Sequence, residues 1–164
     1  MNILDHAMQI EKEGEQIYRE FATASPSEEL STVFNWLADA ELRHFELFRS
    51  MKDQQFPALE ESPLLENVVN VFQKIKENKD HNSFKSNKGD VYKRALSIEE
   101  KMAAFYNEKA EESDDANKKE IFKKIALEEK RHQHIIENII NLVNNPEIWI
   151  KEGKFREILD FYPL

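Results

Sequence analysis

The 164-residue sequence contains no cysteine. This absence excludes disulfides, thiolate zinc sites and iron–sulfur clusters within these residues. Glycine and proline are also scarce, with three and five copies. So few turn-forming residues favour long helices over many short strands.

Basic residues are outnumbered by acidic ones, with 23 lysines and arginines against 32 aspartates and glutamates. The net charge of −9 and the pI near 5.1 argue against nucleic acid and anionic membrane surfaces as partners. No apolar run approaches the roughly 20 residues that span a bilayer, and the first residues lack a signal-peptide pattern. We therefore expect one cytoplasmic domain over residues 1–164, without a nucleic-acid or membrane partner.

Apolar residues recur at helical spacing along most of the chain. The pattern predicts an all-α four-helix bundle made of two helical hairpins and a long crossover. The expected parts are a first hairpin at about 3–52, a crossover at 53–88, a second hairpin at about 90–144, and a short C-terminal helical segment at 145–164. Ser25 is expected to cap the second helix of the first hairpin, with Pro26 in the first helical position. The crossover is expected to hold a helix at 63–77, followed by a mobile polar loop at 78–90.

The motif Glu-x-x-His occurs twice, at Glu41–His44 and Glu129–His132. Within each motif the two residues lie on one helix face about one turn apart. The two motifs are 88 residues apart in the chain. A gapless shift by 88 residues gives 12 identities in the 38 positions from 7 to 44. Composition alone would give about two or three. The two hairpins are therefore interpreted as two copies of one unit.

The same shift aligns Glu11 with Glu99, and each precedes a tyrosine by seven residues, Tyr18 and Tyr106. Seven residues is nearly two turns, so each glutamate shares a helix face with its tyrosine. That face is otherwise apolar, where an unpaired carboxylate is costly. Four buried glutamates are tolerable together if positive charge lies between them, and two divalent metal ions would supply it.

This arrangement matches the ligand pattern of ferritin-like di-metal bundles. The six candidate metal ligands are Glu11, Glu41, His44, Glu99, Glu129 and His132. Carboxylate oxygens and imidazole suit iron or manganese, with zinc as a further alternative. A bundle whose motifs hold no metal, serving as a helical scaffold, remains open.

The paired motifs resemble those of the ferritin-like domain of rubrerythrins. The resemblance covers residues 3 to about 143 and is carried by Glu11/Tyr18, Glu41/His44, Glu99/Tyr106 and Glu129/His132. It implies a di-iron oxidoreductase that reduces hydrogen peroxide, or oxygen, and protects against oxidative stress. It also implies that Tyr18 and Tyr106 hydrogen-bond to ligand carboxylates.

The sequence departs from that family in two respects. Typical rubrerythrins carry a rubredoxin domain, which a cysteine-free stretch cannot form, so we expect electrons from a separate donor protein such as a rubredoxin. Typical members also have an extra glutamate where this chain has Met102. That glutamate belongs to an iron that changes ligands with redox state. Ferroxidation and iron binding without a storage cage therefore remain an alternative function.

The first testable prediction concerns association. Neither hairpin can bury its apolar and carboxylate face alone, so the hairpins can pair within one chain or between two. We expect a homodimer, and helix-exchanged dimers occur among rubrerythrin-like proteins. The aromatic segment from Trp149 to Tyr162 offers further apolar surface. Sedimentation at micromolar concentration should give twice the 19.4 kDa chain mass. A concentration-independent mass of one chain would contradict both the dimer and the exchange.

Overall fold

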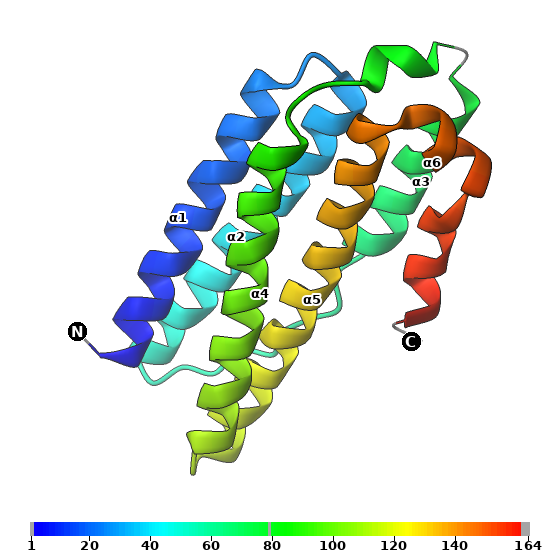
Figure 1. Ribbon diagram of the computed structural model, residues 1–164. Helices are drawn as coiled ribbons and strands as arrows, with labels where there is room; N and C mark the ends of the chain where they lie inside the picture. The colour runs from blue at the N-terminus through cyan, green and yellow to red at the C-terminus, as the bar shows by residue number, and fades with distance from the viewer. Residues whose placement is uncertain (1, 79, 162–164) are drawn as a thin grey trace. The chain divides into compact units, whose positions relative to one another are not determined.

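The computed structural model describes residues 2–78 and 80–161, and within these ranges it contains helices and no strand. The elements in chain order are α1 (Ile3–Ala24), α2 (Glu28–Lys52), α3 (Leu64–Glu77), the 3-10 helix η1 (His81–Phe84), α4 (Gly89–Glu112), α5 (Ala116–Asn144), α6 (Pro146–Glu152) and the 3-10 helix η2 (Lys154–Phe161) (Figure 1). The all-α class predicted from the sequence is confirmed. None of these helices is both long enough and apolar enough to span a membrane.

Helices α1 and α2 form the first hairpin and lie side by side (Figure 1). The Asn2 side chain caps α1 by accepting from the backbone N–H of Asp5 at 2.8 Å. The expected N-cap of α2 at Ser25 is wrong, because Ser27 fills that role and its hydroxyl accepts from the N–H of Leu30 at 3.2 Å. Ser25 is instead the C-cap of α1, with extended backbone angles. Two serines flank Pro26, and the later one caps the helix.

The structure divides into two compact units, and α4 and α5 each contribute to both. The first unit contains the chain up to Glu61 together with Lys101–Glu129. Its aromatic core joins α2 to α4 and α5, because the Phe48 ring lies 5.4 Å from Tyr106 and 5.8 Å from Phe122 between centroids. α1 and α2 therefore share one compact unit with the C-terminal half of α4 and the first half of α5.

The second unit contains Ser62–Glu100 and the chain from Lys130 onward. Its core includes an aromatic cluster in which Trp149 stacks on Phe155, with 4.9 Å between ring centroids, and forms a T-shaped pair with Phe72, with 5.4 Å between centroids. The indole N–H of Trp149 also donates to Asn138 Oδ1 at 3.2 Å. The C-terminal segment thus packs within its own unit. The side chain of Phe161 and all of Tyr162, which the dimer prediction includes, lie outside the described residues.

The polar stretch between α3 and α4 is more regular than the sequence suggested. It contains η1, whose Phe84 is only 4% exposed. The N–H of Ser86 donates to the carbonyl of Val143 at 3.0 Å. One buried aromatic residue and one backbone hydrogen bond therefore attach this stretch to its unit, although its composition is that of a loop.

The second prediction tests the aromatic cluster. Replacing Phe155, which is fully buried, with alanine should lower the free energy of unfolding by about 3–5 kcal/mol, because it removes a large ring from a packed site. The matched control is Ile148→Ala, since Ile148 is 51% exposed and its loss should change stability by about 0.5 kcal/mol or less. Urea unfolding followed by circular dichroism measures both. Equal effects would contradict the packing of the C-terminal segment.

Candidate metal centre

Four of the six candidate ligands converge in the first unit. They are Glu11 on α1, Glu41 and His44 on α2, and Glu129 on α5. Each residue is 0% exposed, and their potential ligand atoms all lie within 4.8 Å of one another. Glu41 and His44 share a face of α2 because they are separated by about one turn. Three helices thus direct three carboxylates and one imidazole to a single point.

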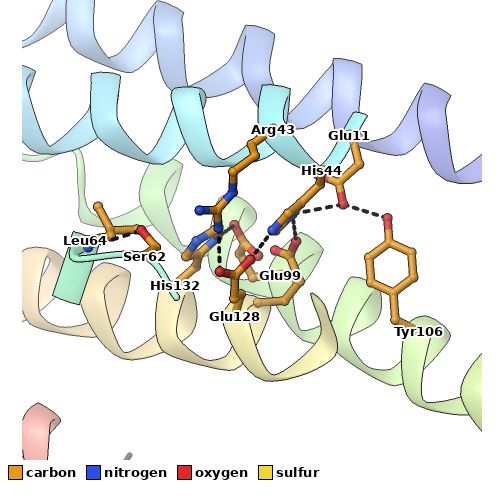
Figure 2. Close-up of polar contacts among 10 residues, drawn as sticks. Glu11, Arg43, His44, Ser62, Leu64, Glu99, Tyr106, Glu128 and His132 are labelled. Carbon is orange, nitrogen blue, oxygen red and sulfur yellow. Dashed lines mark hydrogen bonds and ion pairs between the residues drawn. The ribbon is translucent and has the colours of Figure 1, made fainter. Parts of the chain in front are cut away.

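His44 lies at the centre of this group. Its Nδ1 atom is 2.9 Å from Glu129 Oε1 and 3.4 Å from Glu11 Oε1. In Figure 2, dashed lines join the His44 ring to Glu11 on one side and to Glu128 on the other. The nitrogen that faces the carboxylates is therefore Nδ1, the atom available to bind a metal ion from this direction.

The electrostatics of the cluster favour positive charge at its centre. Burial raises the pKa of Glu11 well above its usual range, and the neighbouring charges of Glu41 and Glu129 raise it further. Burial alone would lower the pKa of His44, but the surrounding carboxylates outweigh it and hold that pKa well above its usual value. A divalent cation supplies the same compensation without protonating the ligands.

Glu11 gives the clearest test of whether a metal ion fits. Its Oε1 accepts a hydrogen bond from the Tyr106 hydroxyl at 2.7 Å, whereas its buried Oε2 has no hydrogen-bond partner among the described residues. A buried carboxylate oxygen without a donor is costly, and a cation would satisfy it. The donor set of carboxylates and one imidazole suits iron, manganese or zinc. The residues therefore fit a metal ion.

Tyr106 meets the expectation that its hydroxyl contacts a candidate ligand from another helix, since Glu11 belongs to α1 and Tyr106 to α4 (Figure 2). Burial raises the pKa of Tyr106 well above its usual value, and the nearby carboxylates add to this. The phenol therefore keeps its proton and acts as a donor. Its repeat counterpart Tyr18 is also buried, at 2% exposure.

The remaining two candidate ligands, Glu99 and His132, meet in the second unit. Glu99 belongs to α4 and His132 to α5, and each is 1% exposed. His132 Nδ1 lies 3.4 Å from Glu99 Oε1. The equivalent distance between His44 and Glu11 in the first unit is also 3.4 Å. The repeat-related glutamate–histidine pairs thus have the same Nδ1–Oε1 distance in both units.

The other residues singled out by the sequence lie as follows. Met102, at which the sequence departs from the resemblance, is an apolar side chain buried in α4 at 3% exposure. Its counterpart Gly14 in α1 allows a close approach, because a Cβ there would lie 3.4 Å from Glu41 Oε2. His134 has a 30% exposed side chain and pairs with Glu137 at 3.6 Å.

Sequence reasoning missed Glu128, which is 7% exposed and contacts the cluster through His44. Its Oε2 contacts His44 Nε2, and its Oε1 accepts from Arg43 Nη2 at 2.5 Å (Figure 2). The internal repeat could not identify Glu128 as a site residue, because the shift by 88 residues aligns it with Ala40.

Comparison with known proteins gives one match. The family model described as Rubrerythrin matches residues 2–140. A search of curated proteins and a search of solved structures each give no match.

The third prediction tests the polar role of Tyr106. Tyr106→Phe removes only the hydroxyl, so it should weaken metal binding by about ten- to hundredfold while changing the melting temperature little. Tyr92→Phe is the matched control, because Tyr92 is a 3% exposed tyrosine on the same helix outside the cluster. Competition with a chromophoric chelator measures affinity. Unchanged affinity together with a large loss of stability would indicate that Tyr106 has a packing role instead.

Proposed function

The chain belongs to the rubrerythrin family, and from this premise we propose that it is a di-iron oxidoreductase that reduces hydrogen peroxide with electrons from a separate donor protein. The observation that carries the proposal is the buried group of Glu11, Glu41, His44 and Glu129, with ligand atoms within 4.8 Å of one another. A cluster of this composition is costly without a cation at its centre.

The proposal includes a second metal position. Glu129 and His132 are three residues apart on the continuous helix α5, so the two side chains emerge about one turn apart. The repeat makes Glu99 and His132 the counterparts of Glu11 and His44, and each pair has a 3.4 Å approach. In the proposed centre, the two ions would be held by Glu11, Glu41, His44, Glu99, Glu129 and His132, the ligand pattern of ferritin-like di-metal bundles.

Two bound ferrous ions would supply the two electrons that, with two protons, convert one hydrogen peroxide into two waters. The protein contributes a dry, preorganised environment. Phe48 and Phe122 pack around Tyr106 and limit the access of water. The Tyr106 hydroxyl donates to Glu11 Oε1 and fixes the orientation of that carboxylate.

The electron donor is proposed to be a separate protein because the chain contains no cysteine for a rubredoxin-type iron site. A second candidate function is ferroxidation with iron binding. The buried Met102 favours it, because an apolar residue replaces the glutamate tied to ligand exchange in typical rubrerythrins. Oxygen would then be the oxidant and iron the substrate.

The fourth prediction distinguishes these functions. After loading with iron and anaerobic reduction, the protein should be oxidised faster by hydrogen peroxide than by oxygen in stopped-flow measurements.

The iron content of a variant tests the second metal position. His132→Ala should lose one bound iron per chain, measured by elemental analysis, because it removes a proposed ligand. His134→Ala is the matched control, since His134 lies on the same helix and pairs with Glu137 instead, and it should keep both ions.

Three results would contradict the proposal. Clearly faster oxidation by oxygen, with mineral build-up, would favour the ferroxidase function. Equal iron content in the two histidine variants would show that His132 is not a metal ligand. Protein that takes up no iron, manganese or zinc would indicate a metal-free helical scaffold.

A further inference from the structure

We propose that Arg43 and Glu128 form a gate through which metal ions enter and leave the four-residue cluster of the first unit. Both residues belong to that unit, as do the four candidate ligands. The gate rests on the proposed function only in requiring that this cluster binds a divalent ion. Each of the four ligands is 0% exposed, so an ion in water touches none of them until a side chain moves.

Exposure falls in steps from the surface to the cluster. The side chain of Arg43 on α2 is 37% exposed, that of Glu128 on α5 is 10% exposed, and that of His44 is 0% exposed. Arg43 Nη2 donates to Glu128 Oε1 at 2.5 Å, and Glu128 Oε2 contacts His44 Nε2 (Figure 2). A route inward along these contacts ends at a candidate ligand, and the ion pair between α2 and α5 lies at its outer end.

The guanidinium of Arg43 is held by one partner. Among the described residues, Glu128 is the only acceptor that it reaches, and its buried Nε atom donates to none. Swinging the side chain into water breaks the ion pair but hydrates Nε, which offsets part of the cost. Arg43 can therefore leave Glu128 by rotation about its own bonds, while both helices stay intact.

An arriving cation can replace the guanidinium of Arg43 at Glu128. Carboxylate oxygens bind divalent ions, and the exchange of one positive group for another leaves no unpaired charge on the buried carboxylate. The ring of His44 lies next on the route. Once Glu128 no longer holds its Nε2 atom, the ring can turn and admit the ion to the side of Nδ1, which lies 2.9 Å from Glu129 Oε1.

The fifth prediction uses cobalt(II) as the probe and Arg43→Gln as the change, because glutamine removes the cation and leaves Glu128 in place. Uptake and release should both become about ten- to hundredfold faster, the effect of losing one charged hydrogen bond from the closed state. Affinity should change by less than about threefold, because the pair stabilises the closed protein with and without the ion. Stopped-flow absorption of the cobalt d–d bands measures uptake, and transfer to excess chelator measures release.

Arg49→Gln is the matched control. Arg49 lies on the same helix, has a 60% exposed side chain and pairs with Glu46. Its replacement removes the same charge away from the route, so both rates should stay unchanged. Arg43→Lys keeps the charge but loses the planar fork, and its rates should be intermediate. Melting curves check that each variant is folded, and Arg43→Lys decides by the same criteria where Arg43→Gln does not fold.

Unchanged rates in Arg43→Gln, or an equal acceleration in Arg49→Gln, would overturn the gate. Faster release with unchanged uptake would also overturn it, because the affinity would then fall and Arg43 would be stabilising the bound ion instead. If the wild type binds cobalt in these cases, the proposed function stands and only the gate fails. A wild type that binds no metal would overturn both.

Discussion

The burial of several carboxylates at one point is the constraint on which the rest of this structure depends. Glu11, Glu41 and Glu129 are each 0% exposed. Removing an ion from water costs several kcal/mol even after relaxation of the surroundings, and the raised pKa of Glu11 reflects that cost. Each compensating group must therefore have a fixed position: the imidazole of His44, the hydroxyl of Tyr106, and the cation that the cluster favours.

Long helices and aromatic packing satisfy this constraint together. α1, α2 and α5 bring side chains from distant parts of the sequence to one point, and rigid helices keep them there. Tyr106 links the two requirements, because its ring stacks with Phe122 while its hydroxyl donates to Glu11. The same packing that limits water also increases the strength of each polar contact inside it. Tyr106 is thus part of both the apolar core and the polar centre.

The periodicity and the repeat predicted the helices and the candidate ligands, because both depend on spacing along the chain. The cap of α2 was not predicted correctly, since Ser25 and Ser27 both suit a cap and only backbone geometry selects Ser27. The stretch between α3 and α4 has the composition of a loop, but it contains the 3-10 helix η1 with the buried residue Phe84. Glu128 was missed for a different reason. Its partner His44 is 84 residues away, and neither spacing nor repeat connects them.

The two hairpins share their candidate ligands and differ at other buried positions. Where the hairpins agree, as at His44 and His132, they supply the same type of ligand. They differ at Gly14 against Met102 and at Ala40 against Glu128. Gly14 leaves room for the Glu41 carboxyl, which lies 3.4 Å from where a Cβ would be, whereas Met102 is a buried apolar side chain. Glu128 contacts Nε2 of His44, whereas its repeat counterpart Ala40 carries no carboxylate. Because the affinity and reactivity of a metal depend on the groups around its ligands, these two unmatched pairs are the positions at which the two copies would differ in chemistry while their candidate ligands stay matched.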